Sequence, residues 1–358
     1  MVNYGGDEVS ALVIDIGTSS LRAGYAGDDT PKAVIPTCYG FKSESIGEGD
    51  VSMAEPEEEG GASAKPEKKV KLYIGQSGPS VWRDGMQIAH PVQNSLSLSH
   101  SALPMLVQAH AKHLLTSPYH NRAGIQLLPH QLIANKQTVD TSVPPRFTLR
   151  DERVPGTTET WRAWYEAKET EEWIQSVAGV IDQGWNEQAA AQRGVRHYEF
   201  PTGYNFYFGA ERLQVGEQYF THSPQLVASN PNLPKTIPAL ISSALSACDP
   251  DLRQVLLGNI VLTGGGSLLS GFADRLSVEL QRNVNHVYSP TLFPDNANFS
   301  HFSKYQVKIH APGNPTERRF GGWLGGSILA SLGTFHQLWI SKEEWQEHGK
   351  AIVGQRCK

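Results

Sequence analysis

The sequence has few cysteines, no long apolar run and no excess of basic residues. Its 358 residues include three cysteines, Cys38, Cys248 and Cys357, which lie far apart and form no C-x-x-C pair. This spacing argues against a disulfide framework and against a zinc site, so we expect three free thiols. No apolar stretch reaches the roughly 20 residues that span a bilayer. The first ten residues lack the basic-then-apolar pattern of a secretory signal, so we expect an intracellular protein with no membrane association.

The charge balance is slightly acidic. The chain has 31 Lys and Arg against 36 Asp and Glu, a formal net charge of −5, and 39% hydrophobic residues. Its mean hydropathy of −0.36 is typical of a soluble globular protein, and its length predicts about two domains. Autonomous DNA binding typically needs a basic face, so the composition argues against it.

The stretch VIDIGTSSLRAGYAGDD, residues 13–29, combines a strand with a hydroxyl-rich turn. Residues 12–14 are apolar and predict a buried strand, and Asp15 after them has a side chain suited to a hydrated magnesium ion. Gly17 lets the backbone approach a ligand, and the hydroxyls beside backbone N–H groups suit phosphate. The alternative is an ordinary β-hairpin whose turn is rich in glycine and serine. The residues expected at the phosphate are Asp15, Gly17, Thr18, Ser19, Ser20 and Arg22.

A second glycine-rich turn lies in NIVLTGGGSLLSGFADRL, residues 259–276. An apolar strand at 260–262 runs into Thr263 and three glycines, and a helix follows with Leu276 and Leu280 on one side. Bare backbone at such a turn allows a flat ring or a phosphate to come close. Glycine-rich turns are common in α/β proteins, but two in one chain suggest a nucleotide held between two lobes. The glycines are Gly264, Gly265 and Gly266.

The rest of the chain is mostly helical, apart from one polar segment. Residues 43–68 are crowded with Glu, Gly, Ser and Lys, so they predict a disordered acidic insert, with an acidic interaction tail as the alternative. Helical periodicity begins at Ala102 and again at Trp161, and residues 198–208 predict a β-hairpin.

Several of these motifs together resemble the actin family. IDIGTSSLRAGYAGDD resembles its first phosphate hairpin, and NIVLTGGGSLLSGFADRL resembles its adenine-side turn. The blocks NRAGIQLLPHQLIANKQ, EEWIQSVAGVIDQGWNEQ, HYEFPTGY and KIHAPGNPTERR are similar to the actin-related protein 4 subfamily rather than to actin itself. The resemblance implies an α/β, actin-like (ribonuclease H-like) two-lobed ATPase fold, here incomplete.

The resemblance also implies a division of the chain. Residues 1–42, 69–93 and 325–358 would form the small-lobe core, like actin subdomain 1. Residues 43–68 would be an insert in the subdomain 2-like region, 94–230 a subdomain 4-like helical region, and 231–324 a subdomain 3-like region with an insert at 287–306.

By function, the resemblance implies a non-catalytic scaffold subunit of nuclear chromatin-remodelling and histone acetyltransferase complexes, acting in transcription regulation and DNA repair. Its partners would be nuclear actin and a helicase-SANT-associated helix, with histones and the nucleosome contacted indirectly. The family's cofactor is ATP with Mg²⁺. Asp15 would contact the Mg²⁺ through water, and the three glycines and Arg319 would lie on the adenine and ribose side of the nucleotide. An ATP-hydrolysing enzyme or a sugar-kinase-like phosphotransferase of the same superfamily is the alternative.

The chain departs from the family after Asn94, where it passes within a few residues to the helix at Ala102. Roughly one hundred residues implied by the resemblance are missing, including the water-positioning glutamine and the second phosphate hairpin, and a phosphate clamp needs donors from both lobes. We therefore expect weakened ATP binding and no catalytic residues.

Residues 327–339, SILASLGTFHQLW, predict a helix. The spacing places Ile328, Leu332, Phe335 and Trp339 on an inward stripe. The resemblance to actin implies that the residues off this stripe lie in a cleft where partner helices dock, whereas the alternative buries every apolar side chain inside. The expected groove residues are Leu329, Thr334 and Leu338, with Leu332 at the edge.

Residues 287–306, VYSPTLFPDNANFSHFSKYQ, interrupt the resemblance, which continues if they are deleted. Valine codons begin with GT, a glutamine codon can be CAG, and Ala297-Asn298 can be encoded with a branch-point-like CTAAC. We therefore interpret this block as a translated intron whose removal keeps the reading frame. A genuine surface insertion between two strands is the alternative, since loops tolerate added length.

Overall fold

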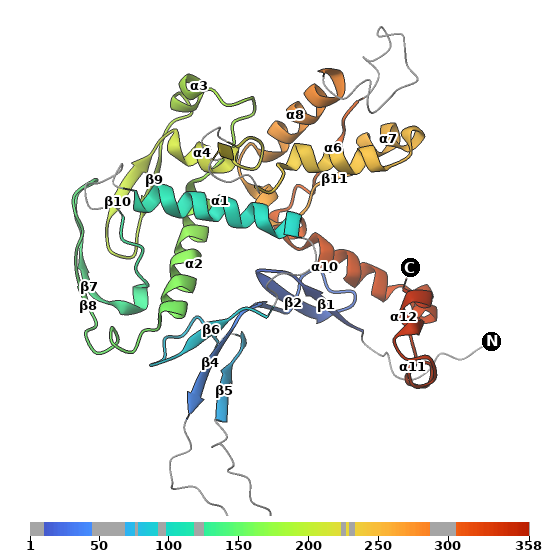
Figure 1. Cartoon of the computed structure of the whole chain (residues 1–358), viewed down its shortest axis with the longest axis horizontal. Coiled ribbons are helices and arrows are strands. Elements are labelled where there is room, and N and C mark those ends of the chain that lie inside the picture. Colours follow the sequence, from blue (N-terminus) through green and yellow to red (C-terminus); the bar gives the residue numbers. More distant parts are fainter. Residues whose placement is uncertain are drawn as a thin grey trace, which may run out of the picture.

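The computed structural model describes residues 11–44, 69–75, 78–91, 98–117, 125–222, 227–228, 233–286 and 306–357. Five small sheets and a set of helices make up the described part, with α1 crossing the middle and α10 running toward the C-terminus (Figure 1). The expected acidic insert lies outside the described residues except for Ser43 and Glu44, which continue strand β4. The block at 287–306 also lies outside them, apart from Gln306.

The first sheet is an antiparallel meander that joins the two ends of the chain. Helix α10 covers one of its faces, and the indole Nε1 of the fully buried Trp323 donates a hydrogen bond to the carbonyl of Val13 at 3.0 Å. The hydroxyl of Ser327 donates to the carbonyl of Asp28 at 2.9 Å. The elements are β1 (Leu12–Ile16), β2 (Ser20–Tyr25), β3 (Ala33–Pro36) and α10 (Pro315–Ser331).

The opposite face of this sheet is open. Leu12, Ile14 and Ile16 are 57, 52 and 64% exposed, so the prediction of a buried strand is wrong for these side chains. Alternate residues of a strand point to opposite faces, and α10 covers the face of Val13 and Asp15. Hydrophobic character alone predicted the strand but not which of its faces is covered.

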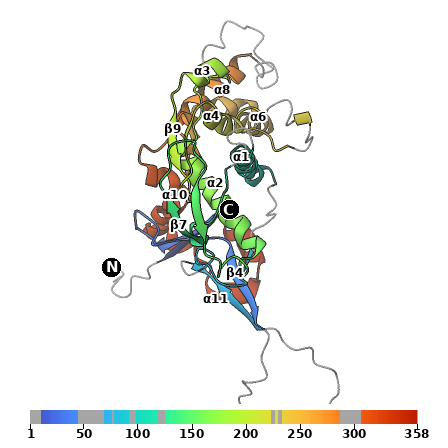
Figure 2. The same ribbon diagram turned by 90° about the vertical axis from the view of Figure 1, so that its left-hand side faces the viewer.

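A second sheet packs against helix α2 at the lower end of the molecule (Figures 1 and 2). The buried Trp161 of α2 lies against Met86 and Ile88, and its indole Nε1 donates to the carbonyl of Pro79 at 2.8 Å. Thr158 caps the helix by accepting from the Trp161 backbone N–H, as a threonine at an N-cap does. The elements are β4 (Tyr39–Glu44), β5 (Lys69–Tyr73), β6 (Gln87–Ala89) and α2 (Glu159–Val177).

The largest core lies where α1, α2, α4 and the β9–β10 hairpin meet. Trp173 is fully buried edge-to-face against Phe208 at 5.1 Å between ring centroids. The predicted hairpin at 198–208 is confirmed as β9 and β10, and the region expected to be helical also contains a second strand pair, β7 and β8. Its elements are α1 (Leu98–Thr116), the 3-10 helix η2 (His130–Leu132), β7 (Ile133–Gln137), β8 (Arg146–Leu149), α3 (Glu187–Ala191), β9 (Arg196–Glu199), β10 (Asn205–Phe208) and α4 (Glu211–Glu217).

A third core surrounds the parallel strands β11 and β12. Leu276 and Leu280 are buried on one side of α8, as their spacing predicts. The segment 287–306 follows α8, so its predicted place between two strands is wrong: a helix precedes it and β12 follows it. The elements are α6 (Ile237–Ala247), α7 (Pro250–Leu257), β11 (Ile260–Val261), the 3-10 helix η3 (Gly265–Leu268), α8 (Phe272–His286) and β12 (Ile309–His310).

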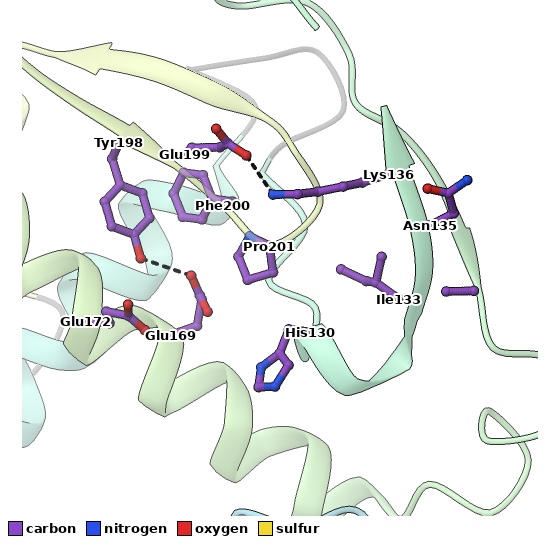
Figure 3. Close-up of a pocket in the computed structure, with 11 residues that line it drawn as sticks. His130, Ile133, Asn135, Lys136, Glu169, Glu172, Tyr198, Glu199, Phe200 and Pro201 are labelled. Carbon is purple, nitrogen blue, oxygen red and sulfur yellow. Dashed lines mark hydrogen bonds and ion pairs between the residues drawn. The ribbon is translucent and has the colours of Figure 1, made fainter. Parts of the chain in front are cut away.

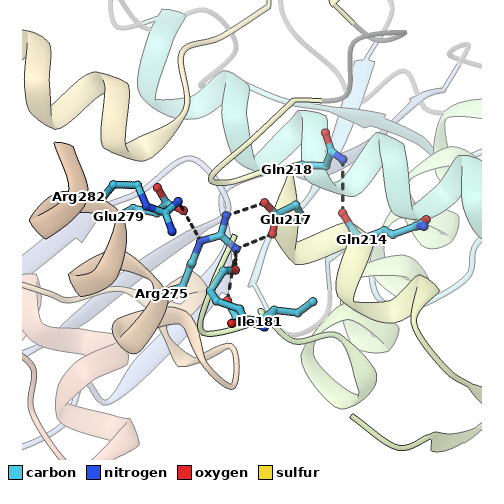
Figure 4. A network of polar contacts seen from close by, with 8 residues as sticks. Ile181, Gln214, Glu217, Gln218, Arg275, Glu279 and Arg282 are labelled. Carbon is cyan, nitrogen blue, oxygen red and sulfur yellow. Dashed lines mark hydrogen bonds and ion pairs between the residues drawn. The ribbon is translucent and has the colours of Figure 1, made fainter. Parts of the chain in front are cut away.

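A buried ion-pair network joins this core to α4 (Figure 4). The guanidinium of Arg275, 1% exposed, donates to both carboxylate oxygens of Glu217 at 2.7 Å and to Glu279 at 2.8 Å. It also donates to the carbonyl of Ile181 at 3.4 Å. A charge taken out of water is stabilised only when it is paired and hydrogen-bonded, and this arrangement meets both conditions.

The C-terminal end consists of α10 and three short helices. The expected division between residues 324 and 325 falls inside α10, so the helix belongs to both of the regions that were expected to be separate. In the described part of the chain, no helix combines the length and the apolar character that crossing a membrane requires. The three short helices are the 3-10 helix η5 (Gly333–Leu338), α11 (Lys342–His348) and α12 (Ala351–Arg356).

Candidate functional site

The predicted glycine- and serine-rich turn is the tip of the β1–β2 hairpin. The backbone N–H of Gly17 donates across the turn to the carbonyl of Ser20 at 3.1 Å. The hydroxyl of Thr37 donates to the carbonyl of Gly17 at 2.7 Å, which holds the hairpin against the end of β3. Thr18 and Ser19 are exposed at the tip. The turn therefore presents two hydroxyls outward on a fixed backbone.

Asp15 and Arg22 face each other across the hairpin. The Arg22 guanidinium donates to the Asp15 carboxylate at 2.6 Å, and the two side chains are 22 and 33% exposed. A carboxylate in such a charge-assisted contact is partly neutralised, which weakens its attraction for a hydrated cation. Helix α10 also lies close to this carboxylate, because a Cβ at Gly322 would lie 3.8 Å from the same oxygen.

The second predicted turn joins β11 to η3. Gly264 has φ of +95°, a conformation that favours glycine, and its N–H donates to the carbonyl of Arg318 at 2.7 Å. A Cβ built on Gly264 would meet no atom within 4 Å, so the described structure leaves open space beside this backbone. The hydroxyl of Tyr219 lies 3.7 Å from the Cβ position of Gly266, and burial raises the pKa of Tyr219 to about 12.

Two consecutive arginines bring α10 to this turn. Arg318, which the sequence did not single out, holds the turn: its Nε donates to the Ser267 hydroxyl at 2.9 Å and its Nη2 to the Ser267 carbonyl at 2.8 Å. Arg319, the predicted site residue, is exposed, and its Cγ lies 3.9 Å from the Cβ position of Gly265. Periodicity within α10 cannot distinguish the two arginines, because only the position of the turn decides which one is held.

Phe320 lies beside two guanidinium groups, that of Arg22 on the first hairpin and that of Arg319, its neighbour on α10. The guanidinium of Arg22 lies 5.7 Å from the centre of its ring, and that of Arg319 lies 5.5 Å away. Phe320 has non-helical φ and ψ of −110° and 18°, which kink α10 at this residue. Helix α10 therefore contacts the first hairpin through Phe320 and the second glycine turn through Arg318.

These residues fit one side of an ATP–Mg²⁺ site. A hairpin tip with exposed hydroxyls faces outward, while the predicted metal carboxylate is already paired with Arg22. Within the described ranges, no second hairpin of the Asp-x-Gly type stands opposite Gly17. Phosphate clamps need donors on both sides of the transferred group, so this donor set does not fit a complete clamp.

The predicted partner surface lies at the other end of α10. The helix ends at Ser331 because Leu332 is extended, with φ of −73° and ψ of 132°, so the prediction of one helix through Trp339 is wrong. The predicted inward stripe is also wrong, since Ile328, Leu332 and Trp339 are 56, 47 and 45% exposed. The break at Gly333 changes the helical phase, so residues before and after it no longer share a face.

Leu329 and Leu338 are 51 and 52% exposed, and Thr334 is exposed as predicted. Phe335 is partly buried edge-on against Trp339, with ring centroids 5.5 Å apart. The alternative in which every apolar side chain of this segment is buried is therefore wrong. We call this region the α10-end surface; it comprises Ile328, Leu329, Leu332, Thr334, Leu338 and Trp339.

A separate cavity of about 540 Å³ lies between α2, β7 and β9, away from both glycine turns (Figure 3). Glu169 and Tyr198 line it, and the sequence reasoning named neither. The sequence feature at this cavity is a glutamate within a predicted helix. One sequence does not show whether that glutamate is buried.

Comparison with known proteins agrees with the motifs. The family model described as Actin matches residues 6–118 and 106–358. "Actin-related protein 4" of Mycosarcoma maydis is 29% identical, with 99% of each chain covered. "Actin-related protein 4" of Emericella nidulans is 30% identical over 99% of this chain and 98% of its own. The protein of that name from Oryza sativa subsp. japonica is 28% identical over 99% of this chain and all of its own.

These alignments also bear on the missing segment. The first two run over 553 and 493 residues, more than the 358 of this chain, so both relatives carry residues without a counterpart here. The family model matches in two parts that overlap at 106–118, near the expected discontinuity after Asn94. With the matched ranges covering almost the whole sequence and the relatives all of one subfamily, the chain belongs to the actin family and is similar to its actin-related protein 4 members.

Proposed function

We propose that this chain is a non-catalytic scaffold subunit of nuclear chromatin-remodelling and histone acetyltransferase complexes. In this role it binds, together with nuclear actin, to a helicase-SANT-associated helix of the complex, and it contacts histones and the nucleosome through the other subunits. Membership of the actin family and similarity to several proteins named "Actin-related protein 4" support this role.

The observation that carries the proposal is the α10-end surface. Leu329, Leu332 and Leu338 are each about half exposed, and Trp339, in the same segment, is 45% exposed. Several exposed apolar side chains within one short segment mark an interaction site more often than a single one does. An amphipathic helix buries such side chains against its own apolar face, which is the helix-in-groove mode of recognition.

The nucleotide residues support a non-catalytic role. Asp15 is paired with Arg22, and the hairpin around Gly17 has no opposing hairpin within the described residues. Hydrolysis needs an oriented water and stabilisation of phosphoryl charge from several directions. One hairpin supplies neither the orientation nor the second set of donors.

An ATP-hydrolysing enzyme is the second candidate, because α10 contacts both the first hairpin and the second glycine turn. Phosphate release and capture of the scaffold helix, measured on the same purified chain, distinguish the two. We expect capture of the helix with phosphate release no faster than in buffer. Appreciable turnover with no capture of the helix would instead favour the enzyme.

A further inference from the structure

The cavity beside α2 has acidic groups at one end and apolar walls. Glu169 and Glu172 come from α2, Tyr198 and Glu199 from β9, and Lys136 from β7 (Figure 3). Lys136 is already paired with Glu199 at 2.6 Å on the exposed rim. The remaining lining residues are His130, Ile133, Ala134, Asn135, Phe200 and Pro201.

Glu169 is the central group. Glu169 is only 6% exposed, and one of its carboxylate oxygens accepts a hydrogen bond from the Tyr198 hydroxyl at 3.1 Å. Among the residues that the structure describes, nothing donates to its second oxygen, although Glu169 lines the cavity. This oxygen is not itself buried: it opens onto the cavity, where a donor from a ligand can reach it.

The residues around Glu169 favour a ligand donor that is positively charged. Glu172 is exposed on the same helix and forms no ion pair with any described residue, so it adds a second negative charge near Glu169. Ile133 and Pro201 add apolar atoms to the lining, against which a methylene chain can lie. A chain with a cationic end can bury its stem on such walls while its head meets a carboxylate.

Two other cations fit less well. No group of three or more metal-ligating side chains occurs in the described ranges, which argues against a metal ion here. A guanidinium binds carboxylates best through two parallel hydrogen bonds, but Tyr198 occupies one oxygen of Glu169. A compact ammonium group needs a single free oxygen and satisfies that condition.

We propose that this cavity is a binding site for an alkylammonium group, the class that contains the lysine side chain and the free polyamines. The ammonium donates to the free oxygen of Glu169 and is attracted by Glu172, while its methylene chain lies against Ile133 and Pro201. The site is independent of the proposed scaffold function, because it shares no residue with the α10-end surface.

Proton linkage supports the assignment. Burial, followed by the neighbouring Glu172 charge, raises the pKa of Glu169 to about 7, with the Tyr198 hydrogen bond acting in the opposite direction. A bound cation favours the ionised carboxylate, so binding should release a proton and strengthen as the pH rises. The other titratable or charged groups facing Glu169 are Glu172 on α2, His130 on η2, Lys136 on β7, and Tyr198 and Glu199 on β9.

The test is a titration of the full chain, followed by NMR, with Nα-acetyl-lysine N-methylamide and with spermidine. The neutral Nε-acetylated amide serves as the ligand control. We expect saturable binding of at least one cation and none of the neutral amide. Tighter binding of the lysine amide would identify a protein lysine as the occupant, and tighter binding of spermidine a free polyamine.

Glu169→Gln removes the charge but keeps an oxygen that accepts from Tyr198, so the fold should be retained. We expect this variant to bind at least about tenfold more weakly and to lose the increase in affinity between about pH 6 and about pH 8. Glu171→Gln is the matched control: Glu171 lies on the same helix, pairs with Lys168 at 2.8 Å and is outside the cavity. Equal affinity in Glu169→Gln and Glu171→Gln, or equal binding of the neutral amide, would overturn the proposal.

Discussion

The guanidinium of Arg22, on the first hairpin, lies 5.7 Å from the centre of the Phe320 ring, on the kink of α10. The guanidinium of Arg319, the residue before Phe320 on α10, lies 5.5 Å from the centre of the same ring. Two segments almost 300 residues apart in the chain therefore meet at one aromatic ring. Arg22 also pairs with Asp15, so its contact with Phe320 ties the first hairpin to α10.

ATP affinity should be much lower than in a family member with both phosphate hairpins. Truncating paired, charged donors typically costs several kcal/mol, and here one whole hairpin has no counterpart in the described part of the chain. Isothermal titration calorimetry of the full chain with ATP and Mg²⁺ measures this affinity. Micromolar binding would show that other residues supply the missing donors.

The buried network around Arg275 should contribute strongly to stability. Glu217→Ala leaves a guanidinium that is 1% exposed without its two-oxygen partner, and loss of one member of a buried pair costs about 3 kcal/mol or more. We expect a clearly lower urea midpoint for this variant.

The matched control is Glu199→Ala, which breaks the ion pair between Glu199 and Lys136. The two side chains are 49 and 47% exposed. Exposed pairs contribute about 0–1 kcal/mol, so its midpoint should barely move. Equal shifts in Glu217→Ala and Glu199→Ala would mean that the Arg275 network is not stabilising.

Glu169 should make the stability of the chain depend on pH. Its pKa is raised from 4.5 to about 7, so the folded chain holds this proton more tightly than the unfolded chain does. Protonation therefore stabilises the fold; the contribution is complete below 4.5 and is lost as the pH rises through 7. A change of this size corresponds to up to about 3 kcal/mol.

The measurement is the free energy of unfolding of the wild type and of Glu169→Gln across this pH range, by urea titration. The difference between the two should change steadily with pH, because glutamine does not titrate. A constant difference would show that Glu169 has an ordinary pKa in the folded chain.

Local sequence patterns predicted the elements that depend on neighbouring residues. The hairpin at Gly17, the turn at Gly264 and the buried side of α8 all follow from glycine conformations and from helical or strand periodicity. The sequence also predicted that both glycine turns belong to one site, which stays a prediction; the structure brings α10 into contact with the first hairpin and with the second turn.

Features that depend on distant packing were not predictable. Leu12 and Ile14 have the hydrophobic character of buried residues, yet their exposure depends on whether another element covers that face of the sheet. The helix expected through Trp339 ends at Ser331, where the extended Leu332 and then Gly333 end the helical phase. Glu169 is polar on a helix, and only the packing of β7 and β9 makes it buried.

The block at 287–306 should be absent from a spliced transcript. The resemblance to the family is continuous across its deletion, and its codons permit splice sites at both ends. Sequencing the locus and the mature transcript settles this point. A spliced message that retains these codons, or a locus without GT and AG at the two ends, would show that the block is a genuine insertion.

Binding of a helicase-SANT-associated helix should depend on Leu329. This side chain is 51% exposed on the α10-end surface, and a buried charge in its place would oppose docking of an apolar helix face. We expect Leu329→Asp to weaken binding by more than about 2 kcal/mol, the scale of an interface hot spot. Circular dichroism should show that the variant keeps its fold.

The control is Leu252→Asp, which changes a leucine of equal exposure, 53%, on α7. Titration of the scaffold helix into the wild type, Leu329→Asp and Leu252→Asp should give a large loss of affinity for Leu329→Asp alone. Equal affinity in all three chains, or no binding to the wild type, would contradict the proposal that this chain is a scaffold subunit acting through its α10-end surface.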